Sequence, residues 1–171
     1  MDLKKKLRHV IDFPKPGIDF IDITTVLQEP EYLRECLDMM HKEIMKAGDF
    51  DLIAGPESRG FIFGVPLAYI MGKGFIPIRK AGKLPYQTVA VEYEKEYGTD
   101  IFEIHSDAVK PGQRIVIVDD LLATGGTTEA NIRLIEKLGG IVTGVFFFIE
   151  LGYLEGRKRL EGYNVRSLVR F

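Results

Sequence analysis

Two adjacent carboxylates and a run of small residues follow an apolar stretch in the second half of the chain. Asp119 and Asp120 come directly after residues 115–118 (Ile-Val-Ile-Val) and lead into residues 123–128 (Ala-Thr-Gly-Gly-Thr-Thr). The glycines let the backbone approach an anion, and the threonine hydroxyls add donors beside the unpaired N–H groups of a helix N-terminus. Adjacent carboxylates suit the vicinal hydroxyls of a sugar. The run therefore predicts a site for a sugar phosphate such as ribose 5-phosphate.

Each part of this run also has a simpler explanation when it is taken alone. A Gly-Gly pair is commonest in turns, and an Asp-Asp pair after a strand is commonly a solvated loop start or a helix cap. The run has neither the Gly-Lys-Ser/Thr of a Walker loop nor the Gly-x-Gly-x-x-Gly of a dinucleotide loop. A nucleoside triphosphate is thus not the expected ligand, and the whole run in order is more specific than any part.

Apolar strands alternate with helical patterns along most of the chain. Strands are expected near residues 51–54, 75–78, 115–118, 141–149 and 165–169, with helices near 33–44, from about 61, and near 132–138. This alternation predicts one domain, residues 1–171, with a doubly wound, mostly parallel α/β sheet. Leu3, Leu7, Val10 and Ile11 recur at helical spacing, so a further helix is expected over about the first dozen residues.

Polar loops follow three of the expected strands, at residues 55–60, 79–83 and 119–128. In open α/β sheets the ligand lies outside the carboxyl ends of the strands, so these loops should converge on one ligand. The first loop carries Ser58 and Arg59, which are suited to binding an anion. A surface arginine near a turn is the plainer alternative.

Residues from about 80 to 100 are too polar for a core and too long for an ordinary connection. Val89, Val91 and Tyr93 alternate with other residues, which predicts a hairpin with residues 101–104. Such a hairpin near a phosphate site is typical of a lid that excludes water. A solvated excursion is the alternative.

The composition limits the kinds of partner and compartment. The chain has 23 Lys and Arg against 25 Asp and Glu, a net charge of -2, so nothing draws it as a whole toward nucleic acid. One cysteine, Cys36, and three histidines without ligand spacing argue against a disulfide or zinc site and favour a cytoplasmic location. The longest apolar run, near residues 141–149, is interrupted by Thr143 and Gly144, so no membrane span is expected.

Residues 118–127, Val-Asp-Asp-Leu-Leu-Ala-Thr-Gly-Gly-Thr, resemble the phosphoribosyl diphosphate signature of the type I phosphoribosyltransferases, in the form carried by the enzymes that act on adenine. The similarity extends along nearly the whole chain. It implies the type I phosphoribosyltransferase fold, with a hood from about residues 1–30 and a lid at about 80–100. The implied reaction moves the 5-phosphoribosyl group of 5-phosphoribosyl 1-diphosphate to a purine nitrogen, with magnesium held mainly through the donor and water.

The resemblance also implies a role for each matching residue. The ribose is assigned to Asp119 and Asp120; the 5-phosphate to Ala123, Thr124, Gly125, Gly126, Thr127 and Thr128; the diphosphate to Ser58, Arg59, Arg79 and Lys83; and the purine to Phe20, Ile21 and Leu151. Arg59 counts as catalytic as well, because it would stabilise the charge on the leaving diphosphate. A homodimer is implied too, in which the basic segment at residues 79–83 sometimes reaches the neighbouring subunit's site.

Ala123 decides where the proton acceptor is sought. Hypoxanthine-guanine relatives carry an aspartate at this place in the signature, and alanine cannot take a proton. Residues 96–100, Glu-Tyr-Gly-Thr-Asp, resemble the lid motif of the adenine enzymes, which makes Glu96 the expected catalytic carboxylate. Solvated carboxylates at Glu92, Glu94 and Glu96 are the alternative.

Two positions in the expected hood depart from the usual pattern of the family. Asp19 stands where an apolar residue is common, and Ile21 where an arginine is common. We expect adenine as the acceptor, giving AMP and diphosphate in purine salvage, but a xanthine, hypoxanthine or guanine enzyme stays open. A non-catalytic regulatory module that binds the donor is a second alternative, and Glu96 and the lack of a basic face argue against it.

Overall fold

The computed structural model describes residues 2–95 and 98–171. The chain divides into two compact units, Met1–Met39 and Met40–Phe171. Helix α3 (Pro30–Met45) contains the boundary; it covers the helix predicted near residues 33–44 and begins at a proline, which suits the first helical position.

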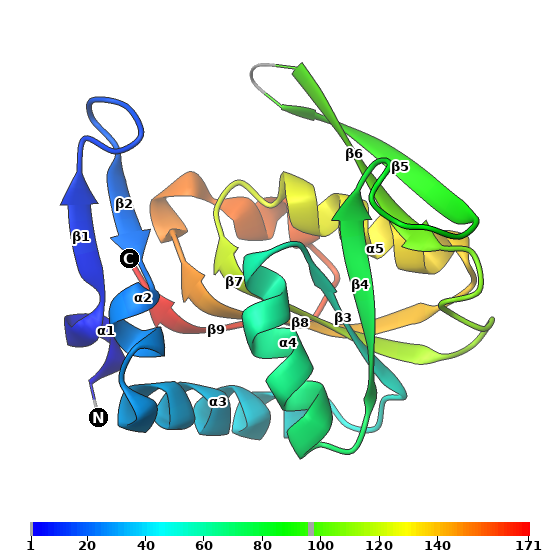
Figure 1. Ribbon diagram of the computed structural model, residues 1–171, viewed down its shortest axis with the longest axis horizontal. Helices are drawn as coiled ribbons and strands as arrows, with labels where there is room; N and C mark the ends of the chain where they lie inside the picture. The colour runs from blue at the N-terminus through cyan, green and yellow to red at the C-terminus, as the bar shows by residue number, and fades with distance from the viewer. Residues whose placement is uncertain (1, 96–97) are drawn as a thin grey trace. The chain divides into compact units, whose positions relative to one another are not determined.

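The larger unit is built on a sheet in which the described residues form seven strands, in the order β5-β6-β4-β3-β7-β8-β9 (Figure 1). The strands are β3 (Leu52–Pro56), β4 (Gly74–Lys80), β5 (Thr88–Lys95), β6 (Gly98–His105), β7 (Arg114–Leu122), β8 (Ile141–Glu150) and β9 (Val165–Arg170). The helical elements are α4 (Arg59–Ile70), α5 (Gly126–Lys137), η1 (Gly152–Leu154) and η2 (Gly156–Leu160). Strands β4, β3, β7, β8 and β9 are parallel, while β5 and β6 form an antiparallel hairpin that joins β4. The predicted mostly parallel sheet and the predicted hairpin are both confirmed.

Helices α4 and α5 pack on opposite faces of this sheet. Ile117 of β7 lies in one apolar cluster with Ile135 of α5 and Phe147 of β8. On the other face, Phe63 of α4 packs against Phe148, with ring centroids 5.6 Å apart. Successive residues of a strand point to opposite faces, so Phe147 and Phe148 separate the two layers, and the sheet is doubly wound.

The smaller unit contains a hairpin of two short strands, β1 (Arg8–Ile11) and β2 (Asp19–Asp22), which are paired antiparallel. The predicted helix over the first dozen residues is wrong, because only α1 (Leu3–Lys6) is helical before β1 begins. The β-branched Val10 and Ile11 fit a pleated strand, and pairing with β2 supplies the backbone hydrogen bonds of that strand. A further short helix, α2 (Thr24–Leu27), follows the hairpin.

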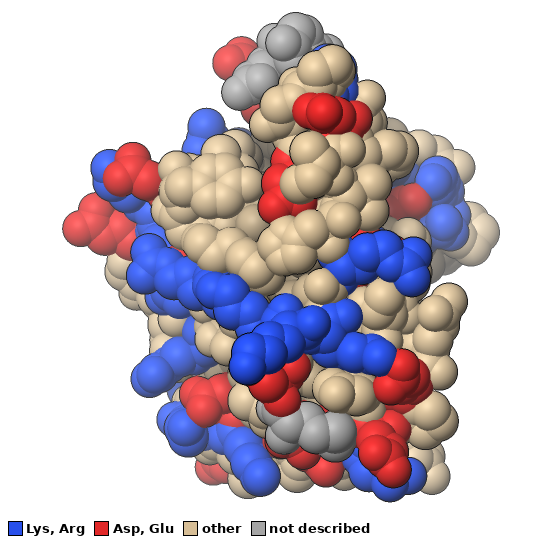
Figure 2. All heavy atoms as spheres, turned by 90° about the vertical axis from the view of Figure 1, so that its left-hand side faces the viewer, with Lys and Arg blue, Asp and Glu red and all other residues tan. Residues whose placement is uncertain are grey.

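The described surface carries charges of both signs. Basic and acidic side chains both occur on the face drawn in Figure 2, in keeping with the balanced composition. Among the helices formed by residues 2–95 and 98–171, none has both the length and the apolar character that a membrane crossing needs.

Candidate active site

A cavity of about 540 Å³ opens where β3 and β7 end, within the size range of small-molecule sites. Ser58, Arg59, Asp119, Asp120 and every residue from Ala123 to Thr128 contribute to its wall. The hairpin formed by β5 and β6 lines it too. Parallel strands end at the same edge of a sheet, which is why loops more than 60 positions apart in the chain meet here.

The carboxylate pair at the end of β7 is buried. Asp119 is 9% and Asp120 4% exposed, and the backbone N–H of Asp120 donates to Asp119 Oδ1 over 2.8 Å. Arg59 Nε lies 3.0 Å from Asp120 Oδ2. Burial, and then the charge of Asp120, raises the pKa of Asp119 well above its ordinary value; burial also raises the pKa of Asp120, which Arg59 opposes. Hydroxyl donors from a ligand would stabilise the charged form of this pair.

Residues 123–125 of the small-residue run form the loop between β7 and α5, and residues 126–128 are the first turn of α5. Gly125 has a φ of 85° and stands directly before the first turn of α5, in a backbone conformation that glycine adopts without strain. The first three residues of the twelve-residue helix line the cavity, and the first turn of a helix carries unpaired N–H groups. Thr127 Oγ1 lies 3.1 Å from the hydroxyl oxygen of Tyr93 on β5. A loop of this geometry can hold an anion with backbone groups.

The cations of the second loop are held by an acidic side chain. Lys83 Nζ lies 2.5 Å from Glu57 Oε2, and Arg79 Nε lies 3.3 Å from Glu57 Oε1. Burial acts to raise the pKa of Glu57, but the Lys83 hydrogen bond and the nearby Arg79 outweigh it, so the pKa lies below its ordinary value. Arg79 and Lys83 are not among the residues that line the cavity within the described chain, whereas Lys80 is.

A sequence profile described as the phosphoribosyl transferase domain matches residues 22–164. The chain belongs to the phosphoribosyl transferase family. Curated relatives named adenine phosphoribosyltransferase are 67% identical in Acetivibrio thermocellus and 69% identical in Ruminiclostridium cellulolyticum, and each alignment covers all of both chains.

Solved structures of the phosphoribosyl transferase family have the same fold. Adenine phosphoribosyltransferase from Thermoanaerobacter pseudethanolicus matches with a TM-score of 0.95 and 54% identity, over 99% of this chain and 98% of that one. The Saccharomyces cerevisiae enzyme, complexed with D-2,5-dideoxy-2,5-imino-altritol 1,6-bisphosphate and adenine, matches with a TM-score of 0.89 and 40% identity, over 97% of this chain and 96% of that one. The predicted type I phosphoribosyltransferase fold is confirmed.

The residues predicted to bind the purine belong to different parts of this phosphoribosyl transferase chain. Phe20 and Ile21 lie on β2 of the unit Met1–Met39, where Phe20 packs edge-on against Phe13 with ring centroids 5.3 Å apart. Leu151 follows β8 in the other unit, and its N–H donates to the carbonyl oxygen of Leu122 over 2.9 Å. The expected catalytic Glu96 lies outside the described residues.

Sequence reasoning gave no individual site role to several residues that line the cavity, although it placed Lys80 in the basic segment 79–83 and Asp100 in the lid motif 96–100. Tyr93, Asp100 and Phe102 of the hairpin contribute to its wall together with Glu57 and Lys80. The rings of Tyr93 and Phe102 are stacked with centroids 5.4 Å apart. The alternation of Val89, Val91 and Tyr93 was the available signal, because it directs all three to one face of the hairpin.

Proposed function

We propose that this chain transfers the 5-phosphoribosyl group of 5-phosphoribosyl 1-diphosphate to adenine, giving AMP and diphosphate in purine salvage. Relatives named for this activity are up to 69% identical over the full chain. One observation carries the assignment of the donor site: a single cavity joins the buried pair Asp119 and Asp120 to the anion loop 123–128. A bound ribose 5-phosphate needs the carboxylate pair for its hydroxyls and the anion loop for its phosphate in the same cavity.

The donor would lie along the carboxyl edge of the sheet. Its 5-phosphate accepts hydrogen bonds from loop 123–128, and its ribose hydroxyls donate to Asp119 and Asp120. Its diphosphate lies toward Ser58 and Arg59, which line the same cavity. Positive charge develops at C1 of the ribose while negative charge develops on the leaving diphosphate. Arg59 stabilises the negative charge on the diphosphate.

The incoming purine nitrogen loses one proton when its bond to C1 forms. Glu96 is the proposed acceptor of that proton, since Ala123 offers no carboxylate in the anion loop. Phe20, Ile21 and Leu151 are the proposed purine contacts. A single domain with a hood at about residues 1–30 and a lid at about 80–100 belongs to the same proposal, as does a cytoplasmic location without a nucleic-acid partner.

Phosphoribosyltransferases generally use magnesium together with the ribosyl donor. Among the described residues no three His, Cys, Asp or Glu side chains are grouped as metal ligands. Magnesium keeps several waters and is usually held by one or two carboxylates and substrate phosphates, and Asp119 and Asp120 fit that donor set. Bound with the donor, the ion would supply positive charge to the diphosphate.

The outer face of α4 supports a homodimer. Ile62, Val65, Tyr69 and Ile70 are exposed on this helix, and Tyr69 reaches 87%. A helix that stays apolar on its solvent side marks an association surface, and a second copy of the chain is the proposed occupant. Light scattering should report a dimer for the wild type and a monomer for Val65→Lys; a monomeric wild type would contradict the proposal.

A purine panel tests the proposed reaction. With 5-phosphoribosyl 1-diphosphate and magnesium, single-turnover assays should give AMP from adenine at a rate far above that of any product from hypoxanthine, guanine or xanthine. If one of those bases reacts at a higher rate than adenine, that base is the acceptor and adenine is not. Binding of the donor without turnover on any base would favour the regulatory module.

A further inference from the structure

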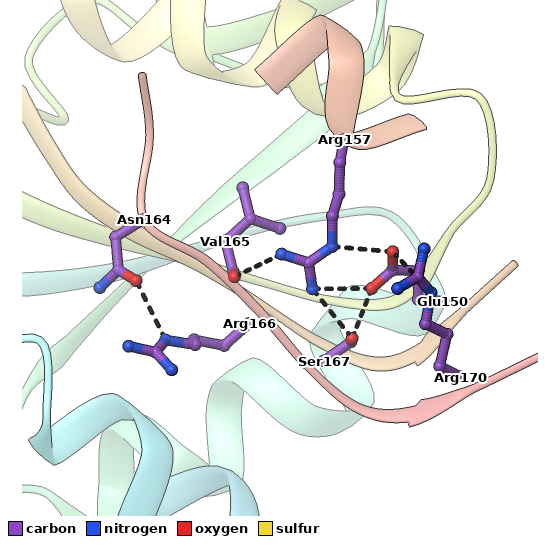
Figure 3. A network of polar contacts seen from close by, with 7 residues as sticks. All are labelled: Glu150, Arg157, Asn164, Val165, Arg166, Ser167 and Arg170. Carbon is purple, nitrogen blue, oxygen red and sulfur yellow. Dashed lines mark hydrogen bonds and ion pairs between the residues drawn. The ribbon is translucent and has the colours of Figure 1, made fainter. Parts of the chain in front are cut away.

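Glu150 is a buried carboxylate at the end of β8, only 2% exposed. Arg157 of η2 binds it with two parallel hydrogen bonds, Nε to Oε1 at 2.8 Å and Nη2 to Oε2 at 2.7 Å (Figure 3). Ser167 of β9 donates to Oε2 over 2.6 Å, and Arg157 Nη1 donates to the carbonyl oxygen of Val165 over 2.8 Å. The hydrogen bonds from Arg157 hold the pKa of Glu150 below its ordinary value. Arg157 therefore attaches η2 to two neighbouring strands.

The segment that Arg157 holds lies directly against the anion loop. A Cβ at Gly156 would overlap the carbonyl oxygen of Ala123, and a Cβ at Gly125 would lie 2.6 Å from the carbonyl oxygen of Gly156. The two backbones touch without side chains between them, so a shift of one must shift the other. Arg159 of the same segment also lies 3.3 Å from Glu129 of α5.

We propose that Arg157 is a positioning residue for the 5-phosphate: by fixing Gly156 against the backbone of Ala123 and Gly125, it sets the shape of the anion loop. The inference rests on the proposed function, because it takes that loop as the 5-phosphate site. Arg157 does not itself line the cavity within the described chain, so it acts through the backbone of its neighbour. A displacement of a binding loop by even 1 Å is costly to function. A shift of Gly156 that moves the anion loop should therefore weaken binding of the 5-phosphate.

Replacing Arg157 by lysine distinguishes a positioning role of its ion pair with Glu150 from a simple attraction between charges. A guanidinium forms a planar fork that matches a carboxylate, whereas a lysine ammonium is a point charge on a flexible stem. Arg157→Lys keeps the positive charge at position 157 but loses the fork. If geometry decides, Arg157→Lys should weaken phosphate binding in the same direction as Arg157→Met.

Two ligands, each covering one half of the donor, provide the test. Calorimetric titration of Arg157→Met should give a Kd for ribose 5-phosphate about 10-fold above that of the wild type, with the Kd for magnesium diphosphate within about twofold. Arg157→Lys should raise the first Kd about fivefold and supplies the measurement if Arg157→Met does not fold. Lys158→Met is the matched control, because its side chain is 72% exposed and leaves the Glu150 pair intact; it should change neither Kd.

Unchanged binding of ribose 5-phosphate in both Arg157 variants would overturn the inference. An equal loss of both ligands would overturn it too, because it would mean general destabilisation. Neither titration uses adenine, so a wild type that binds ribose 5-phosphate but makes no AMP would refute the proposed function and leave the positioning role standing.

Discussion

The two halves of the donor site are built in different ways. The phosphate half, residues 119–128, consists of buried carboxylates and a backbone loop packed against a second backbone segment at Gly156. The diphosphate half, residues 57–59 and 79–83, carries four long cationic side chains, and two of them, Arg79 and Lys83, are paired with Glu57 instead of lining the cavity. If the donor binds as proposed, the phosphate half is preorganised, whereas the diphosphate half must exchange ion pairs before Arg79 and Lys83 can bind the donor.

The largest effect is expected where the halves meet, at the contact between Arg59 and Asp120. Asp120→Asn removes the carboxylate that lies 3.0 Å from Arg59 Nε and that we propose as an acceptor for the ribose hydroxyls. We expect kcat/KM for the donor to fall about 100-fold, since truncating one partner of a buried charge pair costs about 2–5 kcal/mol. Steady-state kinetics provide the measurement. Asp51→Asn, at the other end of the sheet, is the control, and a donor kcat/KM for Asp120→Asn within twofold of wild type would refute the ribose assignment.

A methyl group at Gly125 should damage the phosphate half selectively. Gly125→Ala combines a positive φ with a collision against the Gly156 carbonyl, so we expect the donor KM to rise about 10-fold. Gly112→Ala is the matched control, because Gly112 has a φ of 83° but nothing within 4 Å of an added Cβ. If both variants bind the donor equally well, the close packing of Gly125 against Gly156 does not determine the shape of the phosphate half.

Burial of Asp119 should make the stability of the folded chain fall as the pH rises, because burial disfavours the charged carboxylate. Its pKa is raised in the folded state, so the folded chain binds more protons than the unfolded chain between the ordinary and the raised pKa. Wild-type stability therefore falls as pH rises through that window, by about 1.4 kcal/mol for each pH unit. Asp119→Asn keeps an oxygen that accepts from the N–H of Asp120 and lacks this loss.

Denaturant unfolding at several pH values measures the effect. From about pH 4 upward, the free energy of unfolding of Asp119→Asn should rise relative to that of the wild type, while donor binding weakens. A constant difference across this range would show that burial of the Asp119 carboxylate has no energetic consequence and would contradict the raised pKa.

The smallest effect is expected in the diphosphate half. Glu57→Gln releases Arg79 and Lys83 from their ion pairs but keeps an oxygen to accept from the N–H of Lys80. Partly exposed pairs are worth up to about 1 kcal/mol, so diphosphate should bind about two- to fivefold more tightly. If a calorimetric titration shows that diphosphate binds Glu57→Gln equally or more weakly, Arg79 and Lys83 do not bind diphosphate at the site of their own chain.

The sequence predicts the convergence of the loops at residues 55–60 and 119–128 from the sheet topology, and it predicts the local part of the site in most detail. A strand, two carboxylates and a glycine-threonine loop follow one another between residues 115 and 128, so their spacing alone fixes their relation. The packing of Gly156 against Ala123 joins residues 33 positions apart, and no periodicity signals it. The strand β1 was missed for another reason: its four residues are too few to distinguish a helical from an alternating pattern, and the pairing with β2 decides.

Salt dependence of binding compares the two halves most directly. Wild-type protein should be titrated with ribose 5-phosphate and with magnesium diphosphate at ionic strengths from about 0.01 to 1 M, where the screening length falls from about 30 to 3 Å. Ribose 5-phosphate should lose little affinity, because buried backbone groups hold it, whereas diphosphate should lose much more to the screening of exposed cations. Equal losses for the two ligands, or a steeper loss for ribose 5-phosphate, would contradict the distinction between a preorganised phosphate half and a rearranging diphosphate half.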